Sequence, residues 1–170
     1  MTPSELLDLV YRFYPRGLYT TGAGYDDTEE RRRQREAAHR AVLAYPTWKA
    51  MLRRLGARYP LEDASLHLLS GGFDPAYSGH LEIPARTLGF HVSLLGPYYG
   101  IHRTGSPGEE PAASDLAREI EATYGYEAIP PEIGNLVVPD VTLDTRLFGE
   151  ATIYDCLLSV VWQWSSSPLP

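Results

Sequence analysis

The chain has 170 residues, of which 44% are hydrophobic and 22% charged, a balance typical of a globular domain that excludes general disorder. Its single cysteine excludes an intrachain disulfide and a cluster of thiolate metal ligands, which favours a reducing compartment. The first residues carry no secretory signal and no run approaches the roughly 20 apolar residues of a membrane span, so we expect a cytoplasmic protein without membrane contact.

Residues 1–57 make up the helical part of the prediction. In each expected helix, apolar residues recur at intervals of three and four behind a residue that can cap the helix N-terminus. The three helices are expected to begin at Thr2, Asp27 and Thr47 and to stop at Pro15, Pro46 and Gly56. Pro46 is the expected break between the second and third helices, because a proline inside a helix removes a backbone hydrogen bond.

The start of the second helix is charged on every side. Four arginines there raise the question of a nucleic-acid patch, but glutamates interleave with them and cancel much of their field. These residues are Arg31, Arg32, Arg33 and Arg35, with Glu29, Glu30 and Glu36. We interpret the segment as a solvent-exposed helix face and expect no nucleic-acid binding.

Residues 64–104 predict an antiparallel β-meander, because the period of the apolar residues changes to two from Ser65 onward. Gly- and Pro-containing loops separate the expected strands, which are 65–69, 80–83, 88–95 and 98–102. One face of this sheet is expected to be buried. Its residues are Leu81, Phe90, Val92 and Ile101.

Residues 105–164 predict an acidic helix from about Ser114 to Tyr124, a strand at Leu136–Val141 and a C-terminal element. That last element, Ala151–Trp164, is apolar and fits either a helix or a strand. The expected fold class is α+β, as a single domain over residues 1–170. In it, N-terminal helices precede an antiparallel meander of about four or five strands, with a further helix packed on one face.

Charge is distributed unevenly along the chain. Residues 1–104 hold 13 Lys and Arg against 11 Asp and Glu, whereas residues 105–170 hold Arg118 and Arg146 against 11 acids. An anionic surface of this kind repels nucleic acid and attracts a basic partner. The alternative is that the acids serve solubility alone.

No catalytic motif stands out. The sequence contains neither a Gly-rich phosphate-binding loop ending in Lys-Ser or Lys-Thr nor a Gly-x-Ser-x-Gly nucleophile elbow. Cys156 lies in an apolar run with no histidine near it in sequence, so we interpret it as a core residue. We expect a protein that is not an enzyme and has no cofactor.

Three histidines provide the one arrangement that could bind a metal ion. If a two-residue turn at Gly96–Pro97 sets the pairing of its strands, His91 lies opposite His102. The pairing expected across residues 84–87 puts His80 opposite His91, which gives a row across three strands that could share a zinc ion. The simpler interpretation is a half-exposed sheet face that binds no metal, and a two-residue change of register would break the row.

Two segments carry a resemblance to a known group of proteins. Residues 89–103 (GFHVSLLGPYYGIHR) and 144–156 (DTRLFGEATIYDC) resemble small uncharacterised bacterial proteins that are themselves similar to polymorphic-toxin immunity proteins. The resemblance implies a cytoplasmic α+β protein that binds and blocks a cognate protein toxin, which would be basic if it recognises the acidic surface. No functional residue can be assigned from this resemblance, because such proteins bind through diverse surfaces.

We expect the partner to bind the acidic C-terminal part of the chain, where aromatic residues can anchor an interface. The predicted interface carboxylates are Glu119, Glu121, Glu127, Glu132, Asp140 and Asp144. The candidate aromatic anchors are Tyr98, Tyr99, Trp162 and Trp164. The alternatives are a metal-dependent hydrolase or metal-binding protein built on His80, His91 and His102, and a scaffold protein without a toxin partner.

Overall fold

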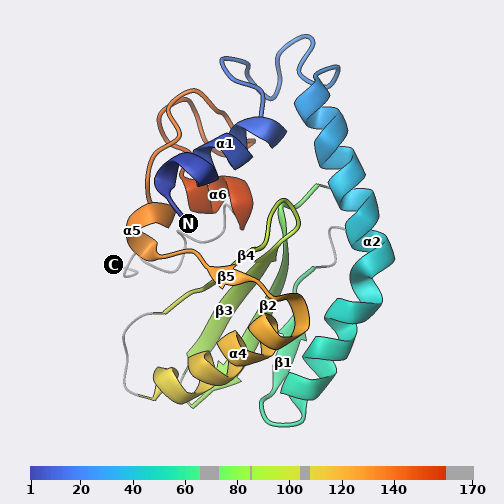
Figure 1. Cartoon of the computed structure of the whole chain (residues 1–170), viewed down its shortest axis with the longest axis vertical. Coiled ribbons are helices and arrows are strands. Elements are labelled where there is room, and N and C mark those ends of the chain that lie inside the picture. The colour runs from blue at the N-terminus through green and yellow to red at the C-terminus, as the bar shows by residue number, and fades with distance from the viewer. Residues whose placement is uncertain (66–72, 85, 104–107, 160–170) are drawn as a thin grey trace.

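The computed structural model describes residues 1–65, 73–84, 86–103 and 108–159 (Figure 1). The helices are α1 (Pro3–Phe13), α2 (Glu29–Gly56), α4 (Glu109–Tyr124), α5 (Pro131–Gly134) and α6 (Ile153–Leu157). The strands are β1 (Leu61–Asp63), β2 (Ala76–Ile83), β3 (Arg86–Ser93), β4 (Tyr98–Ile101) and β5 (Glu127–Ala128). They form one sheet in the order β1-β2-β3-β4-β5, antiparallel except for the parallel pair β4 and β5. The α+β prediction is confirmed. No helix in the described ranges has both the length and the apolar character needed to span a membrane.

Helix α1 begins as the sequence predicts. The Thr2 side chain accepts a hydrogen bond from the Glu5 backbone, and the Glu5 carboxylate accepts one from the Thr2 backbone. This capping box satisfies two of the backbone N–H groups that a helix start leaves without partners. Helix α2 is capped by Thr28, one residue after the predicted start at Asp27.

The predicted break at Pro46 is wrong, because α2 runs through this residue without interruption. One carboxylate, that of Asp63 in β1, binds the helix on both sides of the proline. It accepts hydrogen bonds from the Tyr45 hydroxyl (2.5 Å), Trp48 Nε1 (3.0 Å) and Lys49 Nζ (3.2 Å). These contacts and the packing of the following turns on the sheet outweigh the hydrogen bond that Pro46 cannot donate, a loss of roughly 3 kcal/mol in a helix interior.

One apolar core, which we call the sheet core, lies between the sheet, α2 and α4 (Figure 1). Leu81, Phe90 and Val92 are buried in it, and Ile101 is half-buried against it, so the predicted inner face of the sheet is confirmed. Trp48 stacks on Tyr77 with ring centroids 5.1 Å apart and an interplanar angle of 13°. Large interlocking side chains of this kind dominate the stability of a core.

A second core, which we call the terminal core, joins the two ends of the chain. It packs α1 against α6, and Ala37 of α2 closes one side. The Tyr14 hydroxyl donates to the Cys156 carbonyl (2.8 Å), and the Tyr154 hydroxyl donates to the Ile129 carbonyl (2.7 Å). Much of the backbone around these contacts is irregular, unlike that of the sheet core.

Several predicted elements of the C-terminal part are corrected. Leu136–Val141 is not a strand, because it contributes only an isolated bridge between Val137 and Thr152 to the described backbone pairing. Helix α4 starts at Glu109, five residues before the predicted Ser114. The predicted strand at 65–69 lies outside the described residues except for Ser65, and residues 160–164 of the predicted C-terminal element also lie outside them.

Candidate functional site

The predicted histidine row has the wrong register. In the structure His80 pairs with Gly89, and His91 pairs with Ser78 on one side and Gly100 on the other. At both strand pairs the observed register differs from the predicted one by two residues. The three histidines therefore stay on one face of the sheet but do not lie opposite one another. His80 and His102 flank Gly89 instead, since a Cβ at position 89 would lie 3.9 Å from each of them.

The loop lengths explain this change of register. The prediction placed a two-residue turn at 96–97 and a four-residue loop at 84–87, whereas β3 and β4 are separated by residues 94–97 and β2 and β3 by residues 84–85. Gly96 lacks the positive φ that the commonest two-residue hairpin turns have at their first central residue. Gly96 instead packs beneath α1, where an added Cβ would lie 2.5 Å from the Leu9 side chain.

His91 is a buried neutral histidine. Its side chain is 8% exposed, and its Nδ1 lies 2.8 Å from the Ser78 hydroxyl. Burial, followed by the neighbouring His80 and His102, lowers the pKa of His91 to about 3. Among the residues that the structure describes, no group of three or more His, Cys, Asp or Glu side chains is arranged to hold a metal ion.

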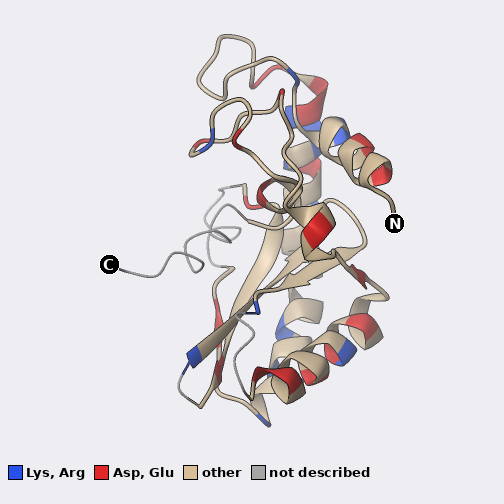
Figure 2. Cartoon of the chain, turned by 90° about the vertical axis from the view of Figure 1, so that its left-hand side faces the viewer, with Lys and Arg blue, Asp and Glu red and all other residues tan. Residues whose placement is uncertain are grey.

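The predicted acidic interface is mostly neutralised along α4. All four acids from Glu109 to Glu119 lie 2.6–2.8 Å from an arginine nitrogen. Arg54, for example, binds Glu119 at 2.6 Å, and the Glu121 carboxylate accepts a hydrogen bond from the Tyr99 hydroxyl. In Figure 2 this helix carries mostly acidic turns, but arginines of other elements pair with them.

The other predicted interface acids have different surroundings. Asp140 pairs with Arg16 at 2.5 Å, which ties the C-terminal part to the segment after α1. Glu127 and Glu132 are exposed on β5 and α5, and neither has an ion-pair partner within the described chain. Asp144 is also exposed, and it lines a pocket at the opposite end of the molecule from α4.

The predicted aromatic anchors are not displayed as expected. Tyr99 is buried in the sheet core, and Tyr98 is half-buried against the terminal core. Trp162 and Trp164 lie outside the described residues. Cys156 is buried, and burial raises the pKa of its thiol well above the usual value, which suits a core residue.

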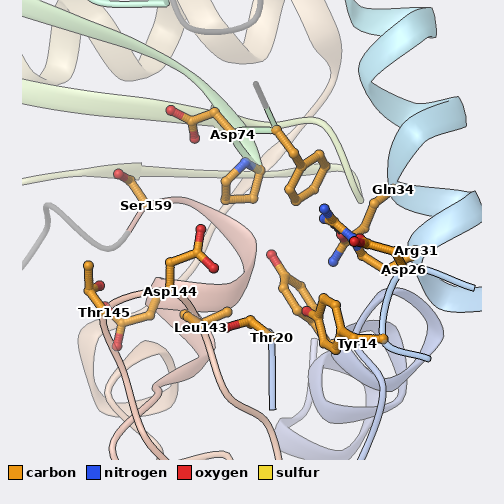
Figure 3. Close-up of a pocket in the computed structure, with 14 residues that line it drawn as sticks. Tyr14, Thr20, Asp26, Arg31, Gln34, Asp74, Leu143, Asp144, Thr145 and Ser159 are labelled. Atoms are coloured by element: carbon orange, nitrogen blue, oxygen red, sulfur yellow. Dashed lines mark hydrogen bonds and ion pairs between the residues drawn. The ribbon is translucent and has the colours of Figure 1, made fainter. Parts of the chain in front are cut away.

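A pocket of about 500 Å³ lies between chain segments that are far apart in sequence (Figure 3). We call it the carboxylate pocket. Its walls come from the connector between α1 and α2, the first turns of α2, the residues before β2 and the loop around position 144. The lining residues are Tyr14, Thr20, Tyr25, Asp26, Arg31, Gln34, Phe73, Asp74, Pro75, Leu143, Asp144, Thr145, Asp155 and Ser159.

Backbone contacts hold the connector against the C-terminal loop beside this pocket. The Gly17 N–H donates to the Asp140 carbonyl (2.8 Å), and the Thr142 hydroxyl donates to the Leu18 carbonyl (2.9 Å). With the Arg16–Asp140 ion pair, these contacts fasten the two segments over a short stretch of each. Two of the pocket walls are therefore held against each other.

The polar lining of the pocket is predominantly acidic. Four carboxylates and one guanidinium, that of Arg31, line it. Arg31 Nε lies 3.2 Å from Asp26, and its guanidinium carbon lies 5.5 Å from the centre of the Tyr25 ring. Figure 3 shows Arg31, Asp26 and Gln34 on one side of the pocket and Asp74, Asp144 and Ser159 on the other.

Asp155 is the most deeply buried carboxylate of this lining. Its Oδ2 accepts hydrogen bonds from the Thr152 backbone (2.9 Å) and hydroxyl (2.8 Å), and Arg146 Nε lies 3.7 Å away. Its Oδ1 is buried without a hydrogen-bond partner. A buried oxygen left without a donor costs roughly 1–3 kcal/mol, so a donor that reached it would stabilise the site.

Exposed apolar side chains lie close in sequence to the pocket residues Thr20 and Thr145. Tyr19 and Leu147 are 53% and 62% exposed, and the Tyr19 and Phe148 rings lie 4.7 Å apart. Gly149 has a φ of 80°, which closes the turn, and the Glu150 carboxylate accepts a hydrogen bond from the Leu147 N–H (2.9 Å). We call Tyr19, Leu147 and Phe148 the apolar rim.

Sequence reasoning found one residue of this site, Asp144, and missed the others. The pocket and rim are built from loop segments with no periodicity, and their partners lie more than 100 residues away. One signal was available, because Tyr19, Tyr25 and three glycines make the connector unusually rich in residues that serve loops and interfaces. Comparison with protein families, curated proteins and solved structures finds no match for this chain.

Proposed function

We propose that the protein is a non-catalytic binding protein of the immunity type, which captures a basic protein toxin through the apolar rim and the carboxylates beside it. The observation that carries this proposal is that the exposed apolar residues Tyr19 and Leu147 belong to the two chain segments that supply the pocket carboxylates Asp26 and Asp144. Tyrosine is enriched among the residues that dominate binding energy, and complementary charge around such a residue favours association.

The location of this surface differs from the predicted one. Arginines neutralise the acids of α4, whereas Asp144 and Glu150 of the loop beside the rim have no arginine partner within the described ranges. An uncompensated negative surface accelerates association with a basic partner, and salt screens this effect. The buried free thiol of Cys156 is compatible with the reducing cytoplasm in which such a protein would act.

The test uses a surface variant and a matched control. Leu147→Asp places a charge in the apolar rim, and Leu43→Asp makes the same change at a residue 69% exposed on α2, away from the rim. The partner is the product of the reading frame adjacent to the gene in its native genome, expressed as a toxin in a host that the protein must protect. We expect Leu147→Asp to weaken binding at least tenfold, about 1.4 kcal/mol, and to abolish protection, while Leu43→Asp retains both.

Two outcomes would overturn the proposal. One is equal protection by both variants and the native chain. The other is a neighbouring product that neither inhibits growth nor binds the purified protein. Binding that is insensitive to salt would remove the electrostatic part of the argument.

A further inference from the structure

We propose that the carboxylate pocket is a binding site for a guanidinium group. The inference goes beyond the proposed function, because it concerns the pocket interior and needs no protein partner. The volume of about 500 Å³ lies within the range of pockets that enclose small organic ligands. An arginine-sized cation fits a space of this size.

The charge of the lining selects a cation. Asp26, Asp74, Asp144 and Asp155 line the pocket, and Arg31 is the cationic side chain among the lining residues. Figure 3 shows that Asp74 and Asp144 lie across the pocket from Arg31 and Asp26. The side of the pocket away from Arg31 therefore carries carboxylates, among which Asp144 has no ion-pair partner in the described ranges.

The pocket already holds one guanidinium of the chain itself. Arg31 binds the Asp26 carboxylate, donates to the Gln34 side-chain oxygen and lies over the face of the Tyr25 ring. A planar guanidinium favours carboxylates and aromatic faces together, because it is delocalised and more weakly hydrated than an ammonium. Arg31 already uses Asp26, Gln34 and the Tyr25 face, so a guanidinium from outside would bind the carboxylates on the other side of the pocket.

Asp155 supplies the independent observation. Its side chain is 1% exposed, it lines the pocket, and its Oδ1 has no hydrogen-bond partner, whereas Oδ2 accepts two hydrogen bonds from Thr152 and lies 3.7 Å from Arg146 Nε. Capping of α6 uses Oδ2 and leaves Oδ1 without a role in the helix. Because Asp155 lines the pocket, we take Oδ1 as the acceptor for a ligand N–H.

The geometry favours an organic cation over a metal ion. A divalent cation needs several oxygen ligands about 2–2.5 Å from one point. The described part of the chain offers no group of three or more His, Cys, Asp or Glu side chains so arranged. Carboxylates on separate walls instead suit a cation that spreads its charge and its five N–H donors over several ångströms.

The test is a calorimetric titration of the full chain with agmatine, which carries a guanidinium and an ammonium group. A second arm uses Nα-acetylarginine amide, which presents the guanidinium as a protein side chain does. We expect saturable binding of at least one probe with a Kd of about 1 mM or lower. Binding of both probes identifies an arginine side chain as the ligand source, and binding of agmatine alone identifies a free small molecule.

Variants locate the binding within the pocket. Asp144→Asn is expected to weaken binding about fivefold to tenfold, because it removes one charge from the lining. Asp155→Asn is expected to do the same, and thermal unfolding checks that its loss of binding is not a loss of folding. Glu127→Gln is the matched control, an exposed acid on β5, and should leave binding unchanged.

The absence of saturable binding by either probe at about 10 mM would overturn the inference, as would an equal effect of Asp144→Asn and Glu127→Gln. This failure is distinguishable from failure of the proposed function. Leu147→Asp alters the rim and should leave probe binding intact. The probe titration contains no protein partner, so its result does not depend on whether a toxin binds.

Discussion

The half of the molecule around the sheet core and the half around the terminal core treat their carboxylates differently. Around the sheet core, the carboxylates form structural contacts. Asp63 binds three side chains of α2, and the first four acids of α4 pair with arginines. Around the terminal core, acids gather at a pocket, and Asp155 has an oxygen without a donor. Charge in the first half therefore maintains the fold. In the second half Asp140 does so too, through Arg16, and we propose that the acids of the pocket serve recognition.

The largest expected effect comes from a structural carboxylate. Asp63→Asn removes the charge that holds Tyr45, Trp48 and Lys49 and should lower the free energy of unfolding by about 2–3 kcal/mol. Burial opposes ionisation of Asp63, but these hydrogen bonds outweigh it and hold the carboxyl pKa below its ordinary value. Denaturant unfolding measures the change, with Glu62→Gln on the same strand as the control. Equal effects of both substitutions would contradict the assignment.

The next effect is a pH dependence that originates in the sheet. The native pKa of His91 is about 3, against 6.5 in an unfolded chain, so below pH 6.5 the unfolded state binds a proton that the native state does not. Stability should therefore fall as the pH falls, by about 2 kcal/mol at pH 5 from this residue.

His91→Gln should remove this part of the slope, and His39→Gln, at an exposed position of α2, should not. Denaturant unfolding between pH 5 and 8 gives the comparison. A slope that persists in His91→Gln would show that His91 is not the source.

A smaller effect is expected from the neutralised surface of α4. Arg54 is half-exposed where it binds Glu119, and exposed ion pairs contribute about 0.5 kcal/mol or less. A double-mutant cycle with Arg54→Gln and Glu119→Gln should give a coupling energy of that size, falling with added salt. A coupling energy above about 1.5 kcal/mol would mean that this pair contributes to the free energy of unfolding about as much as the contacts of Asp63.

The smallest effect on stability is expected at the pocket. Asp144 is exposed and has no ion-pair partner in the described part of the chain, so Asp144→Asn should change the free energy of unfolding by less than about 0.5 kcal/mol. Thermal unfolding with the native chain as reference is sufficient. A loss comparable to that of Asp63→Asn would break the distinction between the two halves.

The same two halves differ in how far the sequence predicts them. The alternation of apolar and polar residues identified the inner face of the sheet. The observed strand pairing differs from the predicted one by two residues, which leaves that face unchanged because side chains repeat every two residues along a strand. This difference nonetheless destroyed the predicted histidine row. Local turn rules could not reveal that Gly96 packs against Leu9 of α1, which is a contact between distant parts of the chain.

The terminal core was least predictable for the same reason. Tertiary contacts override the local signal at Leu136–Val141, where apolar residues pack without forming a sheet. The same happens in the other half at Pro46, where Asp63 holds the helix together. The pocket depends on contacts between the connector and the loop at Asp144, which no periodicity encodes. Composition alone indicated an acidic surface, and it could not show which acids arginines neutralise.

The central claim is that recognition of positive charge belongs to the half that contains the carboxylate pocket. A titration of isotopically labelled protein with agmatine, followed by NMR chemical shifts of the backbone amides, tests it most directly. The account predicts shifts concentrated at Tyr25, Arg31, Asp144 and Ser159 and none along α4. Shifts that follow α4, or that spread evenly over exposed acids of both halves, would contradict it.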